Sequence, residues 1–401
     1  MNTTTKNEAA NVETVNEYSN SGWSGRGTLQ QLVTELDRQL KSKVDFVADS
    51  RQMTVANDDD TLRLKPRQMG SISEFIGSTG VEISDQALIQ IGAKASPNAP
   101  TKFLRSMASQ HPEATADLLN TIAMDQPKRR FVRCLDDRVR AWLSDSYRVL
   151  DNYDLAVTAL SAVRDLNGEV FEAALNDTKM RLKFTTREIF DVVDKRREGS
   201  NWYSGGLGNQ DFLRRVAART EQELPGGPGT VHPVVTVTNS ETGQGGLNVR
   251  IGILQGICFN LATVEQVMAQ VHLGQKQEAG IFSQETLDAD AKAIMLKAQD
   301  AIKAAFDQEK FSALIARVKA TAETPVTDPS SSLGNIVKAT DLNEGEVDDV
   351  LKYFLKDYGG EDLFGLSQAI ARISQNTDSA DRADALEAVA GKVMMTPQLV
   401  A

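Results

Sequence analysis

Helical spacing of apolar residues dominates the N-terminal quarter of the chain. Thr28 and Gln31 make a capping-box pair, which predicts a helix that begins at Thr28. The apolar stripe of this helix consists of Leu29, Leu32, Val33, Leu36 and Leu40. Further helices are expected to begin near Ser84 and Pro100, with a third short helix around Leu118. This part of the chain is therefore expected to be mostly helical.

Alternation of apolar and polar residues, which is the spacing of strands, occurs in several shorter runs. Residues 44–49 and 61–66 predict short strands around an acidic turn. Residues 129–144 predict two strands joined by a pair of aspartates, and residues 169–184 predict another antiparallel pair. Cations alternate with apolar residues in the later runs, so these strands are expected to share a basic face.

The most regular hairpin pattern lies between residues 235 and 253. Its expected loop is the seven residues from Ser240 to Gly246. Asn239 and Ser240 readily bond to nearby backbone, and Gly243 tolerates a positive φ angle, so turn formation explains the NSETG sequence. A contact to DNA or to a neighbouring subunit is the alternative role for such a loop. We favour the structural role.

Helical spacing returns after this hairpin. Residues 264–271 predict one helix, and residues 283–320 predict a much longer one. The sequence ETPVTDPSSS has the composition of a linker. Three further helices are expected in the tail that follows it.

These patterns predict an α+β fold in which an antiparallel sheet is packed by helices, with a helical N-terminal part and a small helical C-terminal unit. We expect a disordered leader at residues 1–27 and a mostly helical part with a short hairpin at residues 28–127. Residues 128–320 are expected to form an α+β core with basic strands and a long helix. A linker at residues 321–335 then leads to an acidic helical unit at residues 336–401.

The overall composition is that of a soluble globular protein, with 41% hydrophobic and 25% charged residues among 401. No apolar run approaches the roughly 18 residues of a membrane span, and the first residues lack the pattern of a secretory signal. Cys134 and Cys258 both have apolar neighbours, which gives no disulfide framework and is typical of a reducing compartment. We therefore expect a cytoplasmic protein with no membrane partner.

The formal net charge of -11 conceals a basic centre. Residues 128–256 contain 19 Lys and Arg against 17 Asp and Glu, whereas the rest of the chain contains 25 against 38. Cations on neighbouring strands would follow a phosphate backbone, and aromatic rings would stack on bases. The candidate nucleic-acid-binding residues are Arg138, Arg140, Trp142, Arg148, Lys179, Arg181, Lys183, Lys195, Arg196, Arg197, Arg214, Arg215 and Arg250. The alternative interpretation is that these cations form ordinary solvated faces and that Trp142 packs under a helix.

The sequence features of catalysis are weak. The three histidines, His111, His232 and His272, are scattered and lack the spacing of metal ligands. Cys258 has no histidine near it in the sequence, and no phosphate-binding loop of the P-loop type is present. We therefore expect no enzymatic activity, no metal and no cofactor.

Four stretches carry a resemblance to a known family. They are ISDQALIQIG, RRFVRCLDDRVRAWLSDSYRVLDN, VTNSETGQGGLNVRIGILQGICFN and VHLG, in that order. Together they resemble the phage and plasmid family catalogued as domain of unknown function 932. That family has an Arg-Ala-aromatic-Leu-Ser-Asp-x-Tyr-Arg box, here Arg140 to Arg148, and an Asn-Ser-Glu-x-Gly turn, here Asn239 to Gly243. The resemblance covers about residues 84–300, and Leu261 departs from it by standing where the family commonly has glycine.

The family's basic sheet and long following helix are similar to those of the single-strand annealing recombinases of phages and eukaryotes, which hold one DNA strand in a basic groove. The resemblance implies a phage or mobile-element protein that binds single-stranded DNA and promotes strand annealing in recombination. It also implies a homo-oligomeric ring that acts in the host cytoplasm without nucleotide hydrolysis. Other replication or recombination proteins are expected partners of the acidic C-terminal unit. The alternative is a phage structural, assembly or host-interaction protein with no DNA role.

Overall fold

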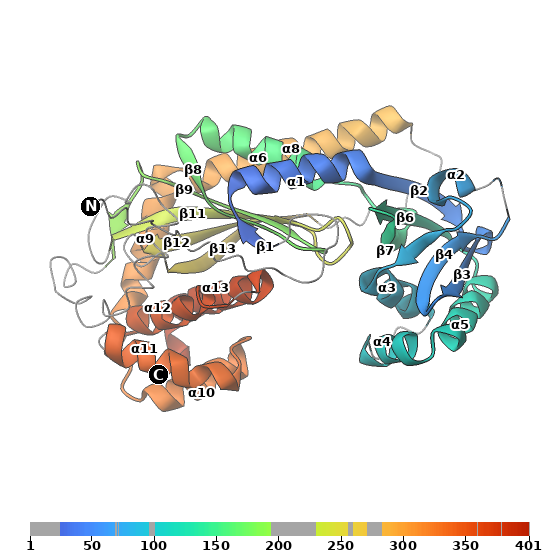
Figure 1. The fold of residues 1–401 in the computed structure, drawn as a ribbon. Helices are drawn as coiled ribbons and strands as arrows, with labels where there is room; N and C mark the ends of the chain where they lie inside the picture. Colours follow the sequence, from blue (N-terminus) through green and yellow to red (C-terminus); the bar gives the residue numbers. More distant parts are fainter. Residues whose placement is uncertain are drawn as a thin grey trace, which may run out of the picture.

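The computed structural model describes residues 25–68, 70, 72–95, 101–193, 230–255, 260–270, 283–358, 360–377 and 379–400. Two β-sheets with accompanying helices make up this part of the chain, which confirms the predicted α+β class (Figure 1). The seven-stranded sheet contains, in spatial order, β1 (Gly25–Gly27), β8 (Gly168–Leu175), β9 (Met180–Thr186), β11 (Thr230–Asn239), β12 (Leu247–Gln255) and β13 (Leu261–Gln270), with β10 (Asp191–Val192) paired to β11. The six-stranded sheet contains β2 (Lys43–Asp49), β6 (Arg129–Leu135), β7 (Arg138–Ser144), β5 (Val81–Ile83), β4 (Thr61–Pro66) and β3 (Met53–Asp58).

The six-stranded sheet is curled. Its edge strands, β2 and β3, are connected only by a 3-10 turn at Ser50–Gln52, so the two edges approach each other at that end. The β3–β4 and β6–β7 hairpins turn on paired aspartates with positive φ angles, as two-residue hairpin loops require. These are Asp59 and Asp60, and Asp136 and Asp137. Four helices accompany this sheet: α2 (Ser73–Ile76), α3 (Asp85–Ala95), α4 (Thr101–Gln110) and α5 (Pro112–Asp125).

The six-stranded sheet crosses the predicted boundary between residues 127 and 128. β6 pairs with β2 along the whole length of both strands, and β7 pairs in parallel with β5. The N-terminal part therefore extends to Ser144 and contains a complete sheet, where a short hairpin was predicted. Alternation predicted most of these strands individually, but it does not reveal which distant strand each of them pairs with.

Helices cover both faces of the seven-stranded sheet (Figure 1). The first layer consists of α1 (Leu29–Ser42), α6 (Asn152–Arg164) and α8 (Gln284–Ala305). The second layer consists of α12 (Leu363–Ser374) and α13 (Ala380–Met395), and α9 (Gln308–Ala322) connects the two layers at one end of the sheet. Two further helices, α10 (Pro329–Ala339) and α11 (Val347–Asp357), complete the C-terminal group.

Local signals placed several of these helices correctly. The predicted capping box of α1 is present: Gln31 N donates to Thr28 Oγ1 at 3.2 Å, and Thr28 N donates to Gln31 Oε1 at 2.9 Å. Ser283 caps α8 as its sequence position predicted, because its hydroxyl accepts from Thr286 N at 3.3 Å. Helix starts are therefore well specified by residues close to them in the sequence.

Three predicted elements differ in the structure. The segment expected to be a helix at 264–271 contributes residues 264–270 to β13, because it extends the sheet by pairing with β12. The long helix at 283–320 is two helices, since Asp307 begins α9 by accepting from Lys310 N at 2.9 Å. The linker at 321–335 is partly helical, because Pro329 occupies the first turn of α10, where its missing N–H costs nothing.

The C-terminal helices are joined closely to the rest of the molecule. Their apolar core is continuous with residues of α9 and of the seven-stranded sheet, so the predicted separate unit on a linker is not what the structure has. Of the predicted disordered leader at 1–27, residues 1–24 lie outside the described residues, whereas Gly25–Gly27 form β1 and pair with β8, so the prediction is wrong for them. The connection from 195 to 229 also lies outside the described residues. Among the helices that are described, none has both the length and the apolar character to cross a membrane.

Candidate nucleic-acid interface

The structure separates the candidate cations into two groups. Arg138 and Arg140 lie on β7, in the six-stranded sheet. The second group lies on or beside β9 and β12 of the seven-stranded sheet and consists of Lys179, Arg181, Lys183 and Arg250. The prediction of one basic face shared by all these strands is therefore wrong, because alternation shows the face of a strand but not its sheet.

The second group forms a row of cations on one face of the sheet. We call Lys179, Arg181, Lys183 and Arg250 the basic stripe. β9 directs its apolar residues into the core beneath α6, so Arg181 and Lys183 face the opposite side. In the strand register, Thr236 of β11 pairs with Lys183 on one side and with Arg250 on the other. Residues paired in this way point to the same face, so the stripe extends across three strands.

Helix α13 lies across the basic stripe and presents carboxylates to it. Asp381, Asp384 and Glu387 are three residues apart, so they share one side of the helix, and we call them the acidic stripe. Lys183 Nζ lies 2.6 Å from Glu387 Oε1. Arg250 Nη2 lies 2.6 and 2.7 Å from the two carboxylate oxygens of Asp384. Every cation of the basic stripe has a carboxylate partner on α13.

These ion pairs are largely removed from solvent. The side chains of Lys183 and Glu387 are 1% and 4% exposed, and that of Arg181 is 3% exposed. Burial raises the pKa of Glu387, although the Lys183 ammonium group acts to lower it. Burial also disfavours ionisation of Asp384, but the attraction of Arg181 and Arg250 is stronger and lowers its pKa. The pKa values of these two carboxylates therefore depend on both burial and the cations of the basic stripe.

Helix α13 also packs closely on β13. A Cβ added to Gly391 would lie 1.8 Å from the carbonyl oxygen of Thr263, so only glycine fits at this position. We call the contact of α13 with the sheet the seat. Several buried polar atoms of the seat have no hydrogen bond within the described structure, among them Nε of Arg181, Nε of Arg250 and Oε2 of Glu387. The seat thus combines close backbone contact with imperfectly bonded charges.

The first group of cations lies at a joint between the two sheets. Arg140 on β7 forms an ion pair with Glu241, in the loop between β11 and β12. Tyr147 Oη donates to the carbonyl oxygen of Ser240 at 2.9 Å. The Arg140 to Arg148 box and the NSETG turn, which together carry the family resemblance, therefore contact each other directly.

The NSETG turn has the structural role favoured from its sequence. Asn239 Nδ2 donates to the carbonyl oxygen of Leu150 and to Asn152 Oδ1, both at 2.9 Å. Gly243 has a φ angle of 76°, which confirms the predicted positive φ. The loop occupies the seven residues predicted for it, and its first three residues are buried against the six-stranded sheet and α6.

Arg133 is the centre of this joint, and sequence reasoning missed it. Its side chain is 0% exposed, and Nη2 lies 2.8 Å from carboxylate oxygens of both Asp45 and Asp151. Its Nη1 donates to the carbonyl oxygen of Glu241 at 3.3 Å. Burial would lower the pKa of Arg133, but the surrounding carboxylates outweigh burial and raise it. The only sequence signal was an arginine inside the apolar run FVRCL.

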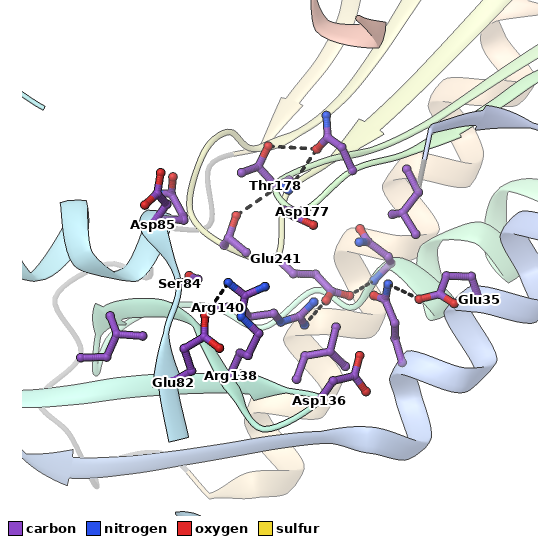
Figure 2. Close-up of a pocket in the computed structure, with 18 of the residues that line it drawn as sticks. Glu35, Glu82, Ser84, Asp85, Asp136, Arg138, Arg140, Asp177, Thr178 and Glu241 are labelled. Carbon is purple, nitrogen blue, oxygen red and sulfur yellow. Dashed lines mark hydrogen bonds and ion pairs between the residues drawn. The ribbon is translucent and has the colours of Figure 1, made fainter. Parts of the chain in front are cut away.

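A cleft of about 600 Å³ opens beside the joint. Figure 2 shows residues that line it. Its carboxylates belong to Glu35, Glu82, Asp85, Asp136, Asp177 and Glu241, and its guanidinium groups belong to Arg38, Arg105, Arg138 and Arg140. Arg138 lies 2.9 Å from Glu82, so it is paired within the cleft. Because carboxylates outnumber cations, this lining disfavours a polyanion. Within the described ranges, no three His, Cys, Asp or Glu side chains are grouped to hold a metal ion.

The remaining candidates do not lie on an open surface of the described chain. Trp142 is 5% exposed in the core of the six-stranded sheet, which confirms the alternative interpretation for this residue. A bulge at Arg140 places Trp142 on the same side of β7 as Val139. Arg148 lies 2.7 Å from Asp290 of α8. The described residues do not include Lys195, Arg196, Arg197, Arg214 and Arg215. Comparison with known proteins found no family model, no curated protein and no solved structure that matches this chain.

Proposed function

We propose that this protein binds single-stranded DNA on the basic stripe and promotes strand annealing as a homo-oligomer, without nucleotide hydrolysis. The proposal rests on one observation: most carboxylates that neutralise the basic stripe belong to α13 and not to the sheet. Lys183 and Arg250 pair with carboxylates of α13 that lie 204 and 134 residues later in the chain. Among the described residues of the sheet, Glu172 is a further partner, 3.2 Å from Lys183. Without α13, this face is an antiparallel surface with a row of cations, which suits a phosphate backbone.

The chemistry of the face suits annealing. Thr236 and Thr238 pair in register with Lys183 and Arg181, so their hydroxyl groups point to the same side as the cations. Hydroxyl and cationic groups contact phosphates without reading sequence. A strand held by its phosphates keeps its bases available for pairing, and neutralised phosphates lower the repulsion between two strands. The family resemblance adds phage or mobile-element origin and a ring-shaped assembly to the proposal.

Fluorescence anisotropy of a labelled oligothymidine tests the binding. Four phosphate contacts predict a slope of about -3 when the logarithm of the association constant is plotted against the logarithm of salt concentration. Sequence-independent binding is commonly in the range of about 1 to 100 µM. If the wild-type protein does not bind at low salt, even at the upper end of this range, the proposed function is wrong.

A matched pair of variants locates the contacts. Arg250→Gln removes one cation of the basic stripe, and we expect it to weaken binding and to reduce the salt slope by about 0.7. Arg138→Gln removes a cation of the acid-rich cleft and is expected to leave both quantities unchanged. Equal losses in the two variants would show that binding does not use the stripe.

Annealing and assembly need separate measurements. The wild-type protein should accelerate pairing of two complementary oligonucleotides in the absence of ATP. Light scattering should give a mass several times that of one chain. A monomer that binds but does not accelerate pairing would leave single-strand binding as the function and remove annealing.

A protein that acts through protein contacts alone is the second candidate. The observation that favours it is the closed state of the stripe, in which Arg181 and Lys183 are almost fully buried. Acidic side chains on α11, such as Asp348 and Asp349, are exposed and are proposed contacts for a partner. An oligomer whose mass and stability do not respond to oligonucleotide would favour this candidate.

A further inference from the structure

We propose that the C-terminal helices α10 to α13 form a gate over the basic stripe, so that single-stranded DNA and the acidic stripe compete for the same cations. This inference rests on the proposed function and adds its regulation. In the closed state, the carboxylates of Asp381, Asp384 and Glu387 contact the cations that would contact phosphates in the open state. A polyanion is therefore the ligand that opens the gate.

The gate has an apolar interior and an ionic seat. Leu366 and Ile370 of α12 are fully buried in one cluster with Leu386 of α13 and Phe354 of α11. These contacts remain intact when the four helices move together. The seat on β9 and β12 is formed by ion pairs, although the apolar cluster of the gate also includes Ile253 of β12 and Ala262 of β13. Interfaces between domains that move apart are more polar than interfaces that stay closed. The seat is therefore the side of the gate that opens.

The opposite side of the gate is suited to be the hinge. Phe311 and Ile315 of α9 belong to the same apolar cluster as the gate. Beyond α9, the chain is tied to the gate: Leu363 N donates to the carbonyl oxygen of Thr324, and Val326 N donates to that of Glu361, both at 2.9 Å. The rotation is placed at the end of α9, before Thr324, and it requires release of the hydrogen bond that Thr321 Oγ1 donates to the carbonyl oxygen of Met394 at 2.7 Å.

The ion pairs of the seat contribute little to keeping the gate closed. Buried ion pairs give little net stabilisation, because both partners lose their water. Several polar atoms at the seat have no hydrogen bond in the described structure, including Nε of Arg250 and Oε2 of Glu387. Phosphate oxygens accept from guanidinium and ammonium groups as carboxylates do. Exchange of carboxylates for phosphates therefore preserves the pairing of the stripe and releases the imperfect contacts.

Neutralising the acidic stripe should open the gate. The seat variant is Asp381→Asn with Asp384→Asn and Glu387→Gln, tested as the full chain by anisotropy with labelled oligothymidine. We expect an affinity about tenfold higher than that of the wild type. Only molecules with an open gate can bind, so the apparent affinity of the wild type is reduced to the fraction that is open. The control is Glu344→Gln with Asp348→Asn and Asp349→Asn, which changes net charge equally on exposed residues of the same helical group.

A second variant opens the seat without changing charge. Gly391→Ala places a Cβ against Thr263 and should displace α13, with an affinity gain similar to that of the seat variant. Its control is Gly334→Ala in α10, where an added Cβ has no neighbour within 4 Å. Thermal unfolding of each variant verifies that it is folded.

The outcomes separate the gate from the proposed function. Tighter binding by the seat variant and by Gly391→Ala, with both controls equal to the wild type, supports the gate. Equal binding by the wild type, the seat variant, Gly391→Ala and both controls overturns the gate and leaves single-strand binding in place. A gain in the charge control as large as that in the seat variant also overturns the gate, because net charge alone would explain it. Absence of binding by every protein overturns the function and the gate together.

Discussion

Lys183 and Glu387 form an ion pair that is nearly closed to solvent. In such a place, an unpaired charge costs far more than the pair contributes, because water cannot solvate the remaining partner. Glu172 is close enough to share the ammonium group, so two carboxylates depend on one lysine. The integrity of the seat therefore depends on keeping cations and carboxylates in balance.

Removing Lys183 alone should be costly. We expect Lys183→Met to lower the free energy of unfolding by about 3–5 kcal/mol, because it leaves buried carboxylates without their cation. The double variant Lys183→Met with Glu387→Met should recover much of that loss. Urea unfolding measures both, and Lys41→Met serves as the control, since Lys41 pairs with Asp37 on an exposed surface. A double variant no more stable than the single one would contradict this account.

Cys134 should be chemically inert in the folded protein. Burial raises the pKa of its thiol to about 12, so the reactive thiolate is scarce at neutral pH. In a Cys258→Ser background, Cys134 should react with a thiol reagent at pH 8 only after denaturant is added. Rapid labelling of the native protein would show that the six-stranded sheet opens readily.

At the scale of elements, the start of α6 shows a side chain diverted from its usual role. Asp151 is the N-cap residue of α6, but its side chain makes no capping hydrogen bond. Its carboxylate instead contacts Arg133 at 2.8 Å and also contacts Lys43. The helix start was predictable from sequence, whereas these partners come from the six-stranded sheet and were not.

This arrangement predicts a loss of stability in acid. Burial disfavours ionisation of Asp151, but Arg133 and Lys43 outweigh it and lower its pKa. In acid, Asp151 therefore binds a proton more readily in the unfolded chain than in the folded one. Its contribution to the free energy of unfolding is lost as pH falls below about 4. Asp151→Asn should be less stable at neutral pH and should show a flatter decline in acid. Parallel pH profiles from urea titrations would contradict the assignment.

Elements that depend on residues close together in the sequence were predicted correctly, whereas contacts between residues far apart in the sequence were not. The capping box of α1 and the loop from Ser240 to Gly246 depend on neighbouring residues, and both are present. The alternation of β9 gave its basic face correctly. Its covering by α13 depends on carboxylates about 200 residues away. The acidic C-terminal unit was therefore expected to face partner proteins, whereas part of its charge faces its own sheet.

At the scale of the whole molecule, the loop between β11 and β12 couples the two sheets. Glu241 connects β7 to the seven-stranded sheet through Arg140, and Asn239 and Ser240 bond to neighbouring segments. Because these residues are buried, the contact is part of the interior. The two motifs that carry the family resemblance therefore hold the two sheets together, whereas the charged stripes lie between α13 and strands β9 and β12.

Glu241→Gln should weaken this coupling, because it leaves Arg140 without its carboxylate and weakens an acceptor for Asn152 N. In a background where Trp23 and Trp202 are replaced by Phe, Trp142 fluorescence reports the six-stranded sheet, and circular dichroism reports the whole chain. Both signals should follow one urea transition in that background and separate into two in Glu241→Gln. Glu82→Gln, which removes an exposed carboxylate from the neighbouring cleft, should keep a single transition. Coincident transitions in Glu241→Gln would mean that other contacts carry the coupling, and the joint would then be a consequence of how the sheets pack.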